Sequence, residues 1–338
     1  MTEQLRPDGS LRHLLTLETL TRGQIEHLLE RSQSFVRPLG EPPPRSTALN
    51  GMTVANLFTE PSTRTRVSFE LAARRLGATA VNLEVQLSSR VKGESILDTV
   101  YTLQSLHVDA FVIRDAQPGV LGLVAAHVAP HVSVLSGGEA HVAHPTQGLL
   151  DALTVYQRKQ RFAGLAIAIV GDLRHSRVAR SAWHAFSKLG VKDVRLSAPP
   201  ALMPESDEFT GCSRHPQLAS ALSGADVVMM LRIQRERMSA KAVWRTVSGL
   251  STCLFTGRIW PSILILMGAL EVKNRSEAFF STISLNSGLV LSVGWRAFTA
   301  ALTASDNAGL GPVVSRSARP FISGAGFTAY GLALPRLS

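Results

Sequence analysis

Cysteine is nearly absent from this sequence, and so are long apolar runs. Of 338 residues only Cys212 and Cys253 are cysteines, and they form no CxxC pair. This excludes a disulfide framework and a cysteine-rich zinc site. The longest apolar run, residues 260–272, is interrupted by Pro261 and is shorter than the roughly 18–20 residues that span a bilayer. The polar N-terminus has no signal-peptide core, so we expect a cytoplasmic protein that makes no contact with a membrane.

Acidic residues are scarce at one end of the chain. The net charge is +10, and residues 239–338 carry nine Lys and Arg but three Asp and Glu. The basic residues of this segment stand singly, with no stripe and no RNA-binding signature, so we expect no nucleic-acid partner. No GxGxxG motif follows the first predicted strand of either half of the chain, so the sequence does not support a dinucleotide-binding site.

Alternating strand and helix patterns predict the fold. The length suggests about two domains. Strands are predicted at 53–58, 79–84, 109–115 and 131–137, and a second series at 164–172, 193–199 and 225–231, with amphipathic segments between them. This order indicates an α/β fold of two doubly wound parallel-sheet domains, joined by interdomain helices such as the one predicted over 144–159. We place the domains at 10–152 and 153–238, and treat 239–338 as an atypical tail.

The polar motifs follow the predicted strands, where ligands bind in such sheets. The sequence Ser-Thr-Arg-Thr-Arg at 62–66 comes after the strand 53–58, at the start of a helix that Pro61 suits and Gly77 can end. Free backbone N–H groups, hydroxyls and guanidinium groups make such a helix end a site for phosphate. An ordinary Ser/Thr cap with solvated arginines is the alternative.

Five motifs stand in order along residues 10–238: STRTR at 62–66, SSRVKGES at 88–95, VIR at 112–114, HPTQ at 144–147 and LRIQRER at 231–237. Together they resemble the carbamoyltransferase family, and within it the catalytic chains that carbamoylate aspartate. The resemblance implies a first domain for carbamoyl phosphate and a second for the amino acid. It implies a homotrimer with shared active sites and neither metal nor organic cofactor. Regulatory or dihydroorotase-like chains accompany some members.

The resemblance also assigns roles to residues that would otherwise be read as surface or structural groups. The phosphate of carbamoyl phosphate would be held by Ser62, Thr63, Arg64 and Thr65. Arg114 would bridge the phosphate and the carbonyl oxygen, His144 would donate to that oxygen, and Gln147 would contact the same substrate. Thr65, Arg114 and His144 would stabilise the oxyanion, while Arg66 would be structural.

The amino-acid substrate follows from a second set of matches. Arg177 and Arg232 match the arginines that bind the two carboxylates of aspartate, with Gln234 beside them, and a dicarboxylate suits two guanidinium groups. Ser88 and Lys92 match residues that reach into the neighbouring subunit's site, Lys92 also contacting aspartate. The chain has no HCLP motif of the ornithine-specific relatives, so aspartate is favoured.

The family pattern ends after Met238. Residues 239–338 contain no HPGP or HPLP loop, whose backbone carbonyls bind the carbamoyl NH₂ in the family, and no long closing amphipathic helix. A reading-frame shift near codon 238 explains the abrupt change, and we favour it over a divergent member with a rebuilt second domain. A shift would leave the second domain incomplete.

The implied reaction is attack of the aspartate amine on the carbonyl carbon of carbamoyl phosphate, with expulsion of phosphate. The product would be N-carbamoyl-L-aspartate, a step in pyrimidine biosynthesis. Two alternatives stay open: a carbamoyltransferase for another amino acid, and a non-catalytic paralogue that binds carbamoyl phosphate or assembles with active chains. Activity of this particular chain is a separate question because of its tail.

Overall fold

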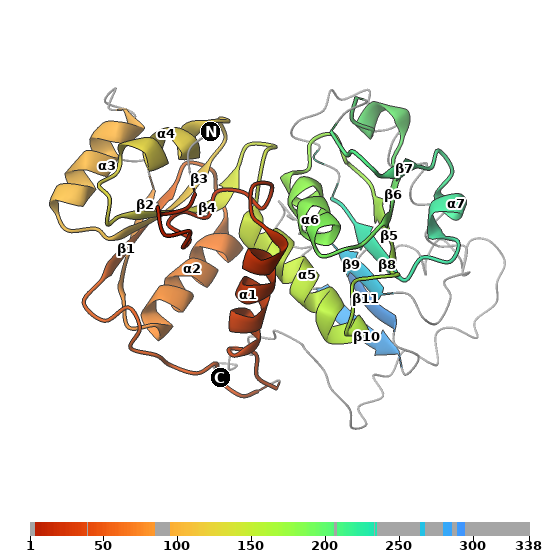
Figure 1. Ribbon diagram of the computed structural model, residues 1–338, viewed down its shortest axis with the longest axis horizontal. Coiled ribbons are helices and arrows are strands. Elements are labelled where there is room, and N and C mark those ends of the chain that lie inside the picture. The colour runs from red at the N-terminus through yellow and green to blue at the C-terminus, as the bar shows by residue number, and fades with distance from the viewer. Residues whose placement is uncertain are drawn as a thin grey trace, which may run out of the picture.

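The structure is a computed structural model. It describes residues 4–38, 40–84, 95–205, 208–232 and 234, together with the strands at 264–267, 280–285 and 289–294. Two α/β units lie side by side, with the helices α1 (Arg22–Gln33) and α5 (Pro145–Lys159) between them (Figure 1). The predicted fold class is confirmed.

The first unit is built on a parallel sheet of four strands in the order β2-β1-β3-β4. Its elements are β1 (Thr53–Phe58), α2 (Thr63–Arg75), β2 (Thr79–Glu84), α3 (Ile96–Ser105), β3 (Ala110–Asp115), α4 (Val120–His127) and β4 (Ser133–Glu139). Helices α3 and α4 cover the face that carries Leu57, Phe111 and Ile113. Helix α2 packs on the opposite face against Val54 and Val112, so the sheet is wound on both sides.

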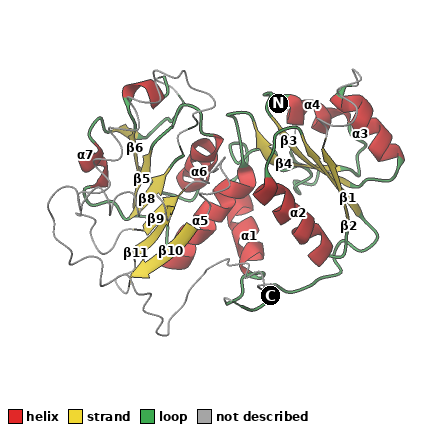
Figure 2. Ribbon diagram, turned by 180° about the vertical axis from the view of Figure 1, so that it is seen from behind, coloured by secondary structure: helices red, strands yellow, loops and turns green. Residues whose placement is uncertain are grey.

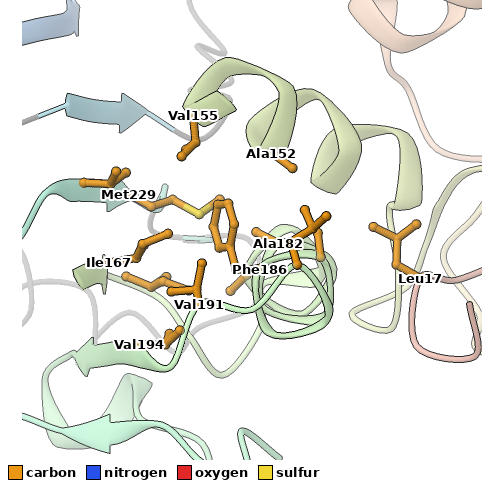
Figure 3. Packing of buried hydrophobic residues seen from close by; sticks show 14 of the residues in the cluster. Leu17, Ala152, Val155, Ile167, Ala182, Phe186, Val191, Val194 and Met229 are labelled. Carbon is orange, nitrogen blue, oxygen red and sulfur yellow. The ribbon is translucent and has the colours of Figure 1, made fainter. Parts of the chain in front are cut away.

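The second unit extends the same architecture. Its elements are β5 (Ala166–Val170), α6 (Arg177–Lys188), β6 (Asp193–Ser197), a 3₁₀ turn (Pro200–Leu202), β7 (Ser213–Arg214), α7 (Leu218–Leu222) and β8 (Val227–Met230). Helices α5 and α6 bury a core of branched and aromatic side chains against β5 and β8, with Phe186 of α6 at its centre (Figure 3). The short α7 covers the other face, over Val170 and Met230.

Three strands from the tail extend the second sheet beyond β8. They are β9 (Leu264–Met267), β10 (Phe280–Leu285) and β11 (Leu289–Gly294), and the sheet order is β10-β11-β9-β8-β5-β6-β7. Figure 2 shows β10 and β11 at one edge of this sheet. Strand β9 runs parallel to β8, whereas β10 and β11 form an antiparallel pair. The rest of residues 239–338, and with it the question of a frame shift, lies outside the described residues.

One local expectation at α2 needs correction. Pro61 does not form the first helical turn: it precedes the N-cap, which is Ser62, and the helix begins at Thr63. Val67 and Leu71, two apolar residues of α2, are about two-fifths exposed. Gly77 ends the helix as predicted, with a φ of +92° that suits glycine.

No helix in the described part of the chain has both the length and the hydropathy to cross a membrane.

Candidate functional site

Arg114 is aimed by a bulge at the carboxyl end of the first sheet. Along β3 and β4 the register pairs Ile113 with Ser136 but Arg114 with Gly138, so Gly137 is an extra residue in β4. A bulge bends the strand and re-aims nearby side chains. The Nη1 group of Arg114 donates to the carbonyl of Gly137 over 3.2 Å, which fixes the guanidinium group at the end of the sheet.

Gly138 leaves room for two arginines. Its φ of +117° suits only glycine, and a Cβ built there would lie 3.1 Å from Arg114 Nη1 and 3.1 Å from Arg177 Cζ. The two guanidinium groups therefore approach the same backbone position from different units of the protein. Arg114 ends β3, whereas Arg177 begins α6.

Glu60 joins these two arginines. Its Oε2 accepts a hydrogen bond of 2.9 Å from Arg177 Nη2. The same oxygen lies 3.2 Å from Arg114 Nε, where the two groups form an ion pair but are not aligned for a hydrogen bond. Arg177 Nη1 also donates to the carbonyl of Ala140 at 3.1 Å. The Arg177 side chain is 9% exposed and that of Arg114 12%. Two largely desolvated cations share one carboxylate here, an arrangement that favours the approach of an anion.

His144 is buried beside the same arginines. It is the N-cap residue of α5, and its backbone N–H donates to Ser181 Oγ at 2.8 Å. Burial, reinforced by the charges of Arg177 and Arg114, lowers the pKa of His144 to about 3. The imidazole is therefore neutral near pH 7 and keeps one N–H donor. A neutral donor next to two cations suits a carbonyl oxygen that gains negative charge.

The hydroxyl groups of the STRTR motif lie at the start of α2, directly after Glu60 and Pro61. Ser62 makes no side-chain cap bond to the helix; its Oγ donates to Thr65 Oγ1 at 3.0 Å. Thr63 and Arg64 are exposed, and Thr65 and Arg66 are half-buried. The motif therefore does not form the ordinary Ser/Thr cap, which leaves the first backbone N–H groups of α2 for an oxyanion.

Gln234 is tied to the loop before α6. Its backbone N–H donates to Asp172 Oδ2 at 3.1 Å, and its side-chain Nε2 donates to the carbonyl of His175 at 2.9 Å. The fully buried Asp172 also contacts His175 Nδ1 at 2.9 Å. The segment that carries Arg232 and Gln234 is thus anchored two to five residues before Arg177.

The structure brings together one part of the predicted site. Arg114, Arg177 and His144 converge, with Gln147 one helical turn beyond His144. Arg232 follows β8 and is half-buried. Ser88 and Lys92 fall in 85–94, outside the described residues. Among the residues that are described, no three His, Cys, Asp or Glu side chains gather as a metal site would require.

Some contributors were not predicted from the sequence. Glu60 stands immediately before Pro61 and the STRTR motif. A carboxylate next to a cationic motif could have indicated an ion pair at the site. The adjacent glycines 137 and 138 signalled a bulge. Nothing in the sequence pointed to Ser181, whose contact with His144 depends on how α6 packs against α5.

Parts of the chain and its fold resemble known proteins. Residues 12–157 match the family "Aspartate/ornithine carbamoyltransferase, carbamoyl-P binding domain". An aspartate transcarbamoylase from Trypanosoma cruzi, solved with carbamoyl aspartate and phosphate, has a TM-score of 0.64 and 26% identity over 86% of this chain and 92% of that one. The catalytic subunit of M. jannaschii aspartate transcarbamoylase has a TM-score of 0.64 and 27% identity over 78% and 87%.

Fold and site define a class: an α/β transferase of two doubly wound units, with arginines from both at one site. Over residues 12–157 the chain is similar to the aspartate/ornithine carbamoyltransferase family. Its fold resembles that of the aspartate transcarbamoylases.

Proposed function

We propose that the protein transfers the carbamoyl group of carbamoyl phosphate to the amine of L-aspartate, giving N-carbamoyl-L-aspartate and phosphate, a step in pyrimidine biosynthesis. The observation that carries the proposal is the convergence of Arg114 and Arg177 on Glu60, with a neutral His144 beside the two arginines. One arginine comes from each unit, which suits a reaction that joins two anionic substrates.

Carbamoyl phosphate is assigned to the first unit. Its phosphate would be held by Ser62, Thr63, Arg64, Thr65 and the start of α2, with Arg114 between phosphate and carbonyl oxygen. His144 would donate to the carbonyl oxygen, and Gln147 would contact the carbamoyl group. Preorganised donors of this kind stabilise the oxyanion of a tetrahedral intermediate, and loss of one costs about 10²–10³ in rate.

Aspartate is assigned to the second unit. Arg177 and Arg232 would each bind one carboxylate, with Gln234 beside them and Lys92 from a neighbouring subunit. The nearby cations favour the neutral form of the attacking amine. The amine attacks the carbonyl carbon; collapse of the intermediate breaks the bond to phosphate, and the leaving phosphate takes the proton. Holding both anions in place supplies the rest of the acceleration.

The test is formation of carbamoyl aspartate by the purified chain, with ornithine as the competing acceptor. Turnover with aspartate but not ornithine is the expected result, and Arg114→Ala is the matched inactive control. Equal or greater turnover with ornithine would refute the substrate assignment. Calorimetry with carbamoyl phosphate alone, run on the same preparation, separates binding from turnover.

A second candidate is a non-catalytic protein that binds carbamoyl phosphate or assembles with active chains. The absence of any HPGP or HPLP sequence after residue 238 favours it.

We keep the domain limits 10–152, 153–238 and 239–338 as part of this proposal, with a frame shift near codon 238 preferred to a rebuilt domain. Translation of the coding DNA in the other two frames tests this: a recovered HPGP or HPLP establishes the shift.

Assembly and location complete the proposal. We infer a cytoplasmic homotrimer in which Ser88 and Lys92 complete a neighbour's site. Light scattering of the purified chain checks the subunit number. A mixing experiment checks the shared site: a Lys92→Ala chain and an Arg114→Ala chain, each inactive alone, should regain activity when combined.

A further inference from the structure

Asp151 is a buried carboxylate that the proposed reaction does not use. It lies on α5, one turn after Gln147, and is 8% exposed. Its Oδ1 accepts a hydrogen bond of 2.9 Å from Gln147 Nε2. Its Oδ2 is buried and has no hydrogen-bond partner among the described residues.

This carboxylate does not serve stability. Among the residues that the structure describes, no Lys or Arg forms an ion pair with Asp151, and burial raises the pKa of its carboxyl group to about 7. A buried acid with a single neutral partner costs free energy that an apolar side chain of similar size would not. Such a local conflict points to a functional role.

The contact sets the orientation of the Gln147 amide. In the structure Oδ1 accepts from Nε2, and the ionised carboxylate, which predominates above the pKa of about 7, can only accept hydrogen bonds; it therefore selects the orientation in which Nε2 faces Asp151. The amide oxygen Oε1 is then turned away from Asp151 and presents an acceptor. The reversed amide would place two oxygens against each other. Without Asp151 the two orientations would differ little, because an amide's N and O have the same shape.

We propose that Asp151 is a positioning residue that holds the Gln147 amide oxygen as the acceptor for the amino group of the carbamoyl substrate. The inference rests on the proposed function. The NH₂ is the only donor of fully ionised carbamoyl phosphate, whose carbonyl and phosphate oxygens face cations and N–H groups. An acceptor fixed in place therefore recognises this part of the ligand. The chain has no HPGP or HPLP sequence to offer carbonyls instead, which makes the Gln147 oxygen more important here.

The experiment compares two ligands that differ only at this group. Calorimetry measures the affinity of the full chain for carbamoyl phosphate and for acetyl phosphate, in which a methyl group replaces NH₂. Asp151→Leu should weaken carbamoyl phosphate binding about five- to tenfold, the value of one hydrogen bond, and leave acetyl phosphate binding unchanged. Asp151→Asn keeps an oxygen that can accept from Nε2, so it should restore most of the affinity.

A double-mutant cycle tests whether Asp151 acts through Gln147. In a Gln147→Ala background, Asp151→Leu should cause no further loss of carbamoyl phosphate affinity. If Asp151→Leu lowers the affinity for both ligands equally, the role of Asp151 is merely structural. That result would overturn the inference but not the proposed function. Failure of the unmutated chain to bind carbamoyl phosphate would overturn the proposed function and, with it, the inference. If Asp151→Leu unfolds the chain, Asp151→Ala takes its place in the same ligand comparison: a loss confined to carbamoyl phosphate supports the role, and an equal loss for both ligands or no loss refutes it.

Discussion

The two sheets hold their site residues in different ways. In the first unit Arg114 belongs to a strand, and the bulge at Gly137 and its carbonyl fix the guanidinium group. In the second unit Arg177 begins a helix, and its partners Glu60 and Ala140 both belong to the first unit. The proposed anion site of the first unit is therefore held by contacts within that unit, whereas Arg177 of the second is positioned by contacts with the first.

Under the proposed function, this difference separates the two substrates. A site fixed within one sheet would bind carbamoyl phosphate without the second unit. A site that depends on contacts between units and on the Gln234 segment is sensitive to changes elsewhere in the second unit. Variants in the two halves should thus affect the two substrates unequally.

The largest effect is expected for the paired arginines. Arg114→Ala should abolish measurable carbamoyl phosphate binding and lower turnover by at least about 10²–10³, because it removes an oxyanion donor and a phosphate contact together. Arg177→Ala should lower turnover at sub-saturating aspartate by a similar factor, yet leave carbamoyl phosphate affinity within about threefold, since other residues form that site. Calorimetry and initial rates measure both.

Lysine variants serve as the matched controls for that prediction. Arg114→Lys and Arg177→Lys keep the charge but lose the planar fork, so each should recover only part of the function its alanine variant loses. Equal loss of carbamoyl phosphate affinity in Arg177→Ala and Arg114→Ala would contradict a self-contained first-unit site.

A smaller effect is expected at the anchor of the Gln234 segment. Asp172→Asn replaces the acceptor of the Gln234 backbone N–H and of His175. A charge-assisted hydrogen bond contributes about 1.5–3 kcal/mol, so the KM for aspartate should rise at least about tenfold. The affinity for carbamoyl phosphate should not change. Initial rates at varied aspartate, with calorimetry as the second readout, check both values.

The matched control for Asp172 is Asp193→Asn. Asp193 lies on β6 and pairs with Arg195, away from the site. This substitution should leave the KM for aspartate unchanged. A rise in KM for both variants would mean that any loss of a second-unit carboxylate disturbs the site.

Most of the first unit could be predicted from the sequence, and less of the second. The strand at 53–58, the helix after Ser62 and the end at Gly77 follow from apolar spacing and a terminating glycine. Arg114 was placed at a strand end by its position after an apolar run. These features depend on residues that are close together in the sequence, so apolar periodicity and helix-ending residues are enough to predict them.

Contacts between distant segments could not be predicted in this way. Glu60 bridges Arg114 and Arg177 across 54 and 117 positions of sequence, from residues 60 to 114 and 60 to 177. Neither the spacing nor the residue types specify which basic side chain a given carboxylate will form an ion pair with. The same holds for Ser181 and His144, which the packing of α6 on α5 brings together.

The last effect concerns stability at acid pH, where an arginine from each unit acts on one residue. Arg114 and Arg177 add to burial in lowering the pKa of His144 to about 3, from an ordinary value of 6.5. Between these two values the unfolded chain binds a proton that the folded chain does not, so folding stability falls as the pH falls from 6.5 toward 3, by at most about 1.4 kcal/mol per pH unit.

His144→Asn should therefore flatten the decline of the free energy of unfolding between pH 6.5 and 4, measured by urea titration. Asp151→Asn provides a contrast of opposite sign, because burial raises the pKa of Asp151 from 3.8 to about 7. There the folded chain binds the extra proton, and stability is lost as the pH rises through that range. Asp151→Asn should remove this loss and gain stability relative to the parent chain toward pH 7. An unchanged acid slope in His144→Asn would mean that His144 is open to protonation in the folded chain, and that the two arginines do not enclose it.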